Sequence, residues 1–134
     1  MRNSAPKAEG MRVEYVPLRE LQRWPRNPKN HDGEAIQASI GRFGFVQPIV
    51  LDESTGRIVA GHGRLESLTA LRDSGAAAPA RVEVAGDDWR VPVLRGVAFA
   101  SEHEAEAFLL ADNATTVLGG WDDAALAEVA RLAR

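Results

Sequence analysis

The residues whose types and spacing best suit chemistry on a phosphate group are Gly-His-Gly-Arg at positions 61–64. A short apolar segment at 57–60 precedes them, and a helical pattern of leucines begins at Leu65. A strand, a glycine turn and a helix N-terminus bring free backbone N–H groups and the positive end of a helix dipole together. The glycines let the backbone approach closely, and Arg64 adds a planar fork of donors. The segment therefore predicts an anion site.

Two common phosphate motifs do not fit this segment. The spacing Gly-x-x-x-x-Gly-Lys-Ser/Thr is absent, and no third glycine stands three residues after Gly63, so neither a P-loop nor the dinucleotide fingerprint is present. Strand, turn and helix with a glycine also occur without any ligand. A tight turn that carries a solvated arginine is the alternative interpretation.

Each side chain of the segment has a functional and a structural interpretation. Arg64 contacts an anion, or it is a surface arginine paired with Glu66 or Glu34. His62 donates to a phosphate or acts as an acid or base, since imidazole titrates near neutral pH; alternatively it hydrogen-bonds its own turn.

Composition excludes several classes of protein. The 134 residues are 45% hydrophobic and 26% charged, which is typical of one globular domain with one core. The absence of cysteine excludes disulfides, thiol catalysis and cysteine zinc sites, and the three histidines lack zinc-motif spacing, so no metal site is predicted. No apolar stretch could span a bilayer, and no secretory signal is present. We expect a cytoplasmic protein without membrane contact, in which polar residues 1–10 form a disordered leader.

Charge is unevenly distributed around a net value of −3. Residues 11–30 hold five basic and two acidic residues, whereas residues 101–128 hold seven acidic residues and no Lys or Arg. The basic end could meet a polyanion such as DNA, or its arginines are scattered over the surface. The acidic end is a solvated face or a partner surface.

Periodicity, caps and turn residues predict an alternation of short strands and helices. Pro48 near the start of one strand favours an edge or entry position. Asp112-Asn113 is expected to end the helix that Ser101 caps, and a ligand role is the alternative. Trp24, Trp89 and Trp121 are expected to be packing anchors. The predicted strands are 13–16, 46–51, 57–60, 81–84 and 90–94, and the predicted helices are 33–42, 65–74, 101–111 and one that begins at Asp122.

Four segments together resemble the N-terminal domain of the ParB/sulfiredoxin superfamily. They are Pro-Arg-Asn-Pro-Lys-Asn-His at 25–31, the run Ser-Ile-Gly-Arg-Phe-Gly-Phe-Val-Gln-Pro-Ile-Val at 39–50, Ile-Val-Ala-Gly-His-Gly-Arg at 58–64, and Leu-Ala-Asp-Asn at 110–113 followed by Gly-Trp-Asp at 120–122. The last looks like the branch found in phages and mobile elements, often beside or fused to DNA methyltransferases.

The resemblance implies an α/β (α+β) fold with a small mixed sheet flanked by helices, formed by residues 11–134 as a single domain. The chain ends at Arg134 inside a helical pattern, so the last helix is expected to be truncated from a longer protein or to pack against another segment. In partition proteins the glycine-arginine segment binds a nucleoside triphosphate. The resemblance therefore implies ATP or CTP, with Mg²⁺, as the cofactor of the present chain. The implied partners are a nucleotide, DNA, a DNA methyltransferase or other phage protein, and a second copy in a dimer.

The chain also departs from the patterns that it resembles. Partition proteins carry a run of arginines after the glycine, whereas here Arg64 stands alone and Glu66 replaces another arginine. Sulfiredoxins place their catalytic cysteine where His62 stands, so sulfiredoxin activity is excluded. His62 and Glu34 are the catalytic candidates, the latter because a related serine kinase carries an acid in this region.

The leading hypothesis is a domain that binds a nucleotide or nucleic-acid phosphate in phage or mobile-element DNA processing. The alternatives are an enzyme (an NTPase, phosphotransferase or nuclease) and a degenerate domain that serves as a protein-interaction platform. For Asn27 and Asn30 the alternative to a role in binding is structural, because asparagine in a proline-rich loop commonly stabilises a turn. The candidate phosphate-binding residues are Gly61, His62, Gly63, Arg64, Asn27, Asn30, His31 and Gln47.

Overall fold

A computed structural model describes residues 10–133, without the side chains of residues 116–118. The predicted leader falls almost entirely on residues 1–9, which lie outside the described part. Within residues 10–133 a five-stranded mixed sheet and four α-helices form the α+β fold that the sequence predicted.

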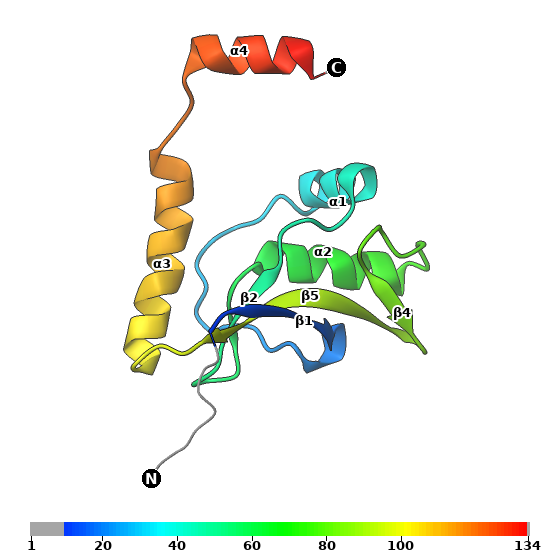
Figure 1. Ribbon diagram of the computed structural model, residues 1–134, viewed down its shortest axis with the longest axis vertical. Coiled ribbons are helices and arrows are strands. Elements are labelled where there is room, and N and C mark those ends of the chain that lie inside the picture. Colours follow the sequence, from blue (N-terminus) through cyan, green and yellow to red (C-terminus); the bar gives the residue numbers. More distant parts are fainter. Residues whose placement is uncertain (1–9, 134) are drawn as a thin grey trace.

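The sheet has the strand order β1-β5-β2-β3, and β4 also pairs with β5 (Figure 1). The long strand β5 is the centre of the sheet, because β1 and β4 pair with it antiparallel and β2 pairs with it parallel. The strands are β1 (Arg12–Pro17), β2 (Ile49–Asp52), β3 (Ile58–Ala60), β4 (Glu83–Ala85) and β5 (Asp88–Val97).

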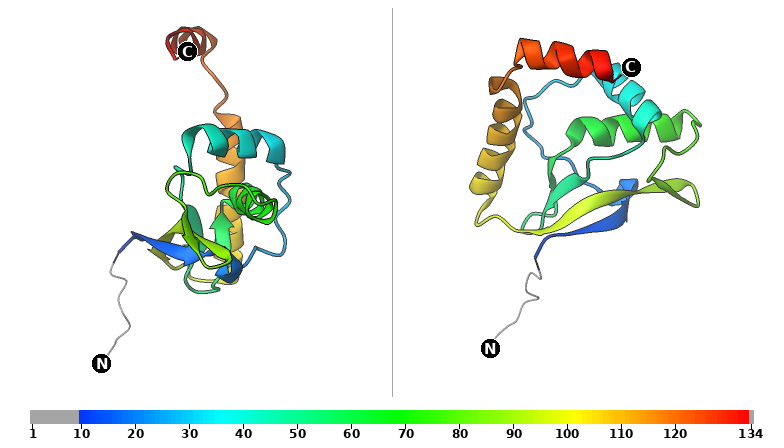
Figure 2. Two further views of the ribbon diagram at one scale, coloured as in Figure 1. Left: turned by 90° about the vertical axis from the view of Figure 1, so that its right-hand side faces the viewer. Right: turned by 45° about the horizontal axis from the view of Figure 1, so that its top comes forward.

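Helices α1 and α2 lie together on one side of the sheet (Figures 1 and 2). Their core includes Phe45, Ile49, Leu68 and Val93, which are almost completely buried. Helix α3 packs against β3 and forms a second cluster. The helices are η1 (Leu18–Glu20), α1 (Gly33–Phe43), α2 (His62–Asp73), α3 (Glu102–Leu118) and α4 (Asp123–Leu132).

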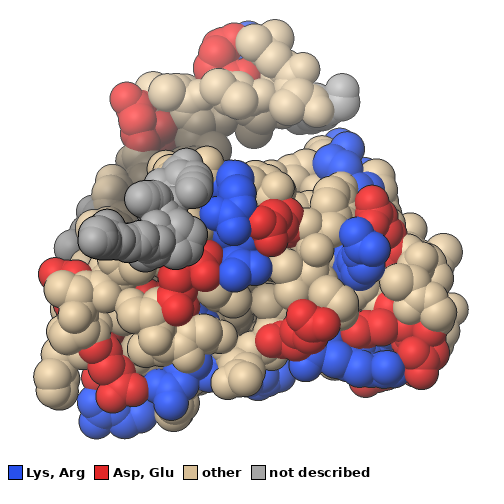
Figure 3. All heavy atoms as spheres, turned by 60° about the horizontal axis from the view of Figure 1, so that its bottom comes forward, with Lys and Arg blue, Asp and Glu red and all other residues tan. Residues whose placement is uncertain are grey.

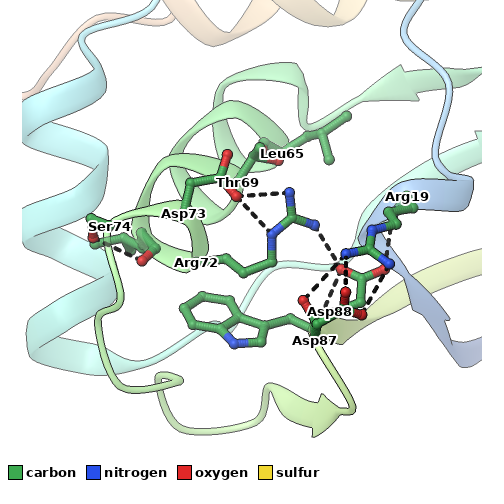
Figure 4. A network of polar contacts seen from close by, with 10 residues as sticks. Arg19, Leu65, Thr69, Arg72, Asp73, Ser74, Asp87 and Asp88 are labelled. Carbon is green, nitrogen blue, oxygen red and sulfur yellow. Dashed lines mark hydrogen bonds and ion pairs between the residues drawn. The ribbon is translucent and has the colours of Figure 1, made fainter.

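A polar network joins the end of α2 to the start of β5 (Figure 4). The buried Asp88 carboxylate accepts from Arg72 Nη1 at 2.7 Å, from the Trp89 N–H at 2.8 Å and from the Arg19 N–H at 3.2 Å. Burial by itself would raise the pKa of Asp88, but these hydrogen bonds lower it below its usual value. The network lies on the opposite end of α2 from the Gly-His-Gly-Arg segment.

Two expectations about element boundaries are wrong. Strand β2 begins at Ile49 and not at residue 46. It lies between β5 and β3, so of the two positions expected for Pro48 the structure shows entry to a strand and not an edge. Helix α3 does not end at Asp112-Asn113 but continues to Leu118. The Asn113 amide reaches the side chain of Asn27 instead of capping the helix.

Helix α4 buries none of its described residues and lies apart from the sheet (Figure 2). Asp122 caps it, as predicted, by accepting from the Ala125 N–H. Trp24 and Trp89 are buried as expected, whereas Trp121 is 78% exposed and is not a packing anchor within the described chain. No helix in residues 10–133 is both long enough and apolar enough to cross a membrane.

Candidate nucleotide-binding cleft

A cleft of about 320 Å³ opens at the N-terminus of α2. Its walls come from the loop before α1, α1 itself and the turn after it, from the end of β3 and the start of α2, and from the middle of α3. These parts are the segments that carry the predicted motifs. The residues that line the cleft are Lys29, His31, Ile36, Ser39, Ile40, Gly44, Phe45, Val46, Gln47, Ala60, Gly61, His62, Gly63, Arg64, Asp112 and Asn113.

The first turn of α2 faces the cleft with its backbone donors. Gly61 is the N-cap in a left-handed conformation with φ of 101°, and it supplies no side-chain cap. The first intrahelical hydrogen bond runs from the Leu65 N–H to the Gly61 carbonyl at 2.8 Å. Helix geometry therefore leaves the N–H groups of residues 62–64 ahead of the helical ladder. A Cβ on Gly61 would lie 2.9 Å from the Ile49 side chain, so both conformation and packing require glycine.

Arg64 is fixed across the cleft from α2 to the start of β2. Its Nη2 donates to the carbonyl of Pro48 at 3.1 Å, while its buried Nε has no hydrogen-bond partner among the described residues. Burial lowers the pKa of Arg64, and the nearby carboxylate of Asp112 opposes that effect. The predicted pairing with Glu66 or Glu34 is wrong, because Glu66 pairs with Arg23 at 2.8 Å and Arg64 turns to Pro48.

Gly63 makes room for protein side chains from the opposite wall. A Cβ at this position would lie 2.8 Å from His31 Nδ1 and 2.8 Å from Ile36 Cδ1. The imidazole of His31 thus occupies the space beside the helix start, and its buried Nε2 finds no partner in the part of the chain that the structure describes. The loop before α1 places a polar ring where α2 carries no side chain.

His62 has a partner that the sequence did not indicate. Its Nε2 accepts from the backbone N–H of Trp24 at 3.0 Å, and the residue is only 5% exposed. Burial, with smaller contributions from the nearby His31 and Arg23, lowers the pKa of His62 to about 4. The expectations that His62 titrates near neutral pH and that it bonds its own turn are wrong. The neutral ring instead holds residue 24 against α2.

The other predicted site residues divide into two groups. His31 and Gln47 line the cleft, whereas Asn27, Asn30 and Glu34 do not. Asn27 accepts from the Lys29 N–H at 3.2 Å, which is the turn chemistry that its proline-rich loop favours. Glu34 lies in the first turn of α1, where an acid is typical, and Asp32 caps that helix.

Several residues that line the cleft are not among the site residues predicted from the sequence. Lys29 lies in the segment 25–31 that carries the resemblance, between the predicted site residues Asn27 and Asn30. Asp112 and Asn113 were interpreted chiefly as a helix end, although they belong to a segment that carries the family resemblance. That resemblance was the available signal, because helix periodicity did not place the middle of α3 opposite Arg64.

The basic residues of the N-terminal part are largely used in ion pairs. Arg12, Arg19, Arg23 and Arg26 pair with Glu14, Asp87, Glu66 and Glu106, respectively. Acidic and basic side chains are interspersed on the side that Figure 3 shows. Lys29 differs, because it lines the cleft together with Arg64. The charges of residues 11–30 therefore favour scattered surface arginines over a broad patch for a polyanion.

Comparison with known proteins agrees with this fold. No family model matches the chain. The chain is 35% identical over 68 residues to the ParB-like nuclease domain-containing protein YnaK of Escherichia coli (strain K12). This match covers 48% of the present chain and 77% of YnaK. The chain belongs to the ParB-like family. The narrower assignment to the branch of phages and DNA methyltransferases stays a prediction.

A solved structure supports the same fold. The crystal structure of the C-terminally truncated chromosome-partitioning protein ParB from Caulobacter crescentus complexed with CTP-gamma-S matches with a TM-score of 0.51 and 25% sequence identity. The match covers 78% of this chain and 52% of that ParB chain. The present chain therefore spans about half the length of its structural relative.

Proposed function

We propose that residues 11–134 act as a ParB-like domain that binds the phosphate of a nucleotide or nucleic acid. The observation that carries the proposal is the start of α2, where residues 61–64 present backbone N–H groups and Arg64 to a cleft. Lys29 adds a second cation to the lining. Helix N-termini and guanidinium groups favour phosphate oxygens because both present several positively polarised donors to one anion.

The proposed ligand is CTP or ATP. Support comes from the solved ParB, whose structure contains CTP-gamma-S, and from the cleft at the corresponding motif of this chain. Oxygen ligands suited to Mg²⁺ also line the cleft: the carboxylate of Asp112 and the side-chain amides of Asn113 and Gln47. These residues fit a magnesium ion that the phosphate oxygens of the ligand help to hold.

The proposed setting is DNA processing in the cytoplasm, in a phage or mobile element. A DNA methyltransferase or another phage protein, DNA itself and a second copy of the chain are the proposed partners. These details extend the family relationship, and each needs its own binding experiment.

A nuclease or other phosphoryl-transfer enzyme is a second candidate, favoured by the name of YnaK and by Asp112 in the cleft. An enzyme would use carboxylates around Mg²⁺ to act on the bound phosphate. Glu34 is not among the described residues that line the cleft, which argues against a catalytic role for its carboxylate. Release of phosphate or cleavage of DNA by the wild-type protein, lost in Asp112→Asn, would favour the enzyme.

An interaction platform is the third candidate, favoured by the apolar side chains that α4 leaves exposed, such as Val129 and Leu132. This function needs no ligand in the cleft. It would be favoured by a wild-type protein that is folded but unaffected by every nucleotide.

Thermal unfolding with added ligands tests the proposal. Wild-type protein is heated with CTP, ATP, GTP or a short DNA, with and without Mg²⁺. A ligand present at 100 times its dissociation constant adds about 2.7 kcal/mol to the free energy of unfolding, so a clear rise in the unfolding temperature is expected.

Two variants decide where the ligand binds. Arg64→Ala is expected to remove about half of the rise or more, whereas Arg90→Ala, which removes an exposed arginine of β5, is expected to retain it. Absence of a rise with every nucleotide and with DNA would overturn the proposal. Equal rises in both variants would place the ligand elsewhere.

A further inference from the structure

Arg81 adopts a backbone conformation that arginine seldom takes. Its φ of 72° is the only positive value among the non-glycine residues that the structure describes. A side chain in this left-handed region is strained by contact between Cβ and the backbone. Such strain persists only where the surroundings enforce it, and it often marks a functional position. Arg81 lies in the connection between α2 and β4 and does not line the cleft.

The guanidinium of Arg81 holds the turn that follows α1. Its Nε donates to the Phe45 carbonyl at 2.9 Å, and its Nη2 donates to the carbonyl of Phe43. The neighbouring residue closes the same contact, because the Ala80 carbonyl accepts from the Phe45 N–H at 3.0 Å. A single planar fork thus binds two carbonyls on either side of Gly44.

Gly44 shows how closely the two segments approach. Its φ of 83° requires glycine, and a Cβ there would lie 2.8 Å from the Cβ of Ala80. The turn is therefore clamped against residues 80–81 by both packing and hydrogen bonds.

The clamped turn continues into a wall of the cleft. Residues 44–47 line the cleft, and the next residue, Pro48, supplies the carbonyl that accepts from Arg64 at 3.1 Å. Two arginines therefore hold opposite ends of one short segment. Arg81 binds its beginning from outside the cleft, and Arg64 binds its end from inside.

We propose that Arg81 is a positioning residue for the phosphate-binding cleft: it fixes residues 43–48, and through the Pro48 carbonyl it sets the position of the Arg64 guanidinium. This inference rests on the proposed function for its effect on ligand affinity. Its effect on the turn itself does not depend on any ligand.

Amide hydrogen exchange in the protein without ligand tests the clamp directly. Arg81→Gly removes the fork and also relieves the backbone strain, so the fold is expected to survive. Loss of the hydrogen bonds that hold the turn is expected to speed exchange at the Phe45 amide about tenfold. Amides of β5 such as Val93 serve as the internal reference and are expected to change little. Unchanged exchange at Phe45 would overturn the inference.

Two further variants separate geometry from charge. Arg81→Lys keeps the positive charge but cannot bind both carbonyls with a planar fork, so it is expected to resemble Arg81→Gly in exchange at Phe45. Arg42→Ala removes a guanidinium from the same end of α1, where Arg42 lies over the Phe43 ring rather than on a carbonyl. It is expected to leave the exchange of the Phe45 amide unchanged.

Titration with CTP, measured by calorimetry, adds the binding test. Arg81→Gly is expected to weaken CTP binding about tenfold at an unfolding temperature close to that of the wild type, and Arg42→Ala is expected to bind normally. Full affinity in Arg81→Gly would overturn the inference while the proposed function stands. A wild-type protein that does not bind CTP would count against the proposed function alone. The hydrogen-exchange experiment needs no ligand and would still test whether Arg81 holds the turn.

Discussion

The ring of His31 lies where a side chain on residue 63 would stand. An ideal Cβ on Gly63 would be 2.8 Å from His31 Nδ1 and 2.9 Å from its Cγ, both atoms at the base of a rigid ring. The loop before α1 and the first turn of α2 therefore fit together only because residue 63 is glycine. This contact places an imidazole beside the helix N-terminus and helps to shape the cleft.

Gly63→Ala is expected to destabilise the protein, although alanine normally stabilises a helix by up to ~1 kcal/mol relative to glycine. The added methyl group must displace His31 or Ile36, and overpacking of this kind costs about 1–3 kcal/mol. Chemical denaturation measures the change. The double variant His31→Ala/Gly63→Ala is expected to recover part of the loss, and additive losses would contradict the assigned contact.

Arg64→Ala is expected to weaken nucleotide binding by about 10- to 100-fold, because charge-assisted hydrogen bonds contribute about 1.5–3 kcal/mol. Arg64→Lys keeps the charge without the planar fork and is expected to fall between Arg64→Ala and the wild type. Calorimetric titration with CTP measures these affinities. Wild-type affinity in Arg64→Ala would remove this residue from the binding site.

The free energy of unfolding is expected to decrease as the pH is lowered through the range in which the His62 imidazole titrates. The pKa of this imidazole is about 4 in the folded protein and near 6.5 when it is unfolded. As the pH falls from about 6.5 to 4, the unfolded state binds a proton that the folded state does not. The free energy of unfolding therefore decreases by up to about 3 kcal/mol over this range.

Replacement of the imidazole tests this assignment. His62→Gln keeps an acceptor for the Trp24 N–H and carries no titratable proton, so its stability between pH 4 and 6.5 is expected to be flatter than that of the wild type. His103→Gln alters an exposed histidine and should keep the wild-type dependence. The wild type and His62→Gln carry the same carboxylates, so the difference between their curves reports on residue 62. Parallel curves for wild type and His62→Gln would refute the role of His62.

Arg72→Met is expected to lower stability by about 2 kcal/mol, because a hydrogen bond to a charged group contributes about 1.5–3 kcal/mol, and to leave ligand affinity unchanged. It removes the ion pair to the buried Asp88, whose two backbone donors remain (Figure 4). The site of the change is at the other end of α2 from the cleft. Denaturation and CTP titration together check this separation, and a large loss of affinity would show that the two ends of α2 are coupled.

The order of strands and helices could be predicted because the caps and turn residues that define it are local. Asp122 caps the helix that it was expected to begin, and Asp32 caps the helix that was predicted at 33–42. The segment at 61–64 was also placed correctly, since its glycines and the following leucines specify a helix start in any context. The predictions failed where distant segments decide, as at the end of helix α3, which continues past Asp112 and Asn113 to Leu118.

Side-chain partners were the least predictable feature of the cleft. His62 bonds to Trp24 and Asn113 to Asn27, contacts that join residues far apart in the sequence. Asp112 and Asn113 are residues that often end a helix, but α3 continues past them to Leu118. The Asn113 amide instead donates to the side chain of Asn27, which is far away in the sequence. No local pattern could indicate that Arg81 would adopt a left-handed conformation to hold two carbonyls.

Backbone NMR during a titration with CTP, in the presence of Mg²⁺, tests the cleft most directly. The amide signals of Gly63 and Arg64 are expected to move more than those of the rest of the chain, because their N–H groups meet the phosphate. The signal of Gln47, across the cleft, is expected to move as well. Signals that stay unchanged at 61–64, or that move mainly elsewhere, would contradict the binding of phosphate at the N-terminus of α2.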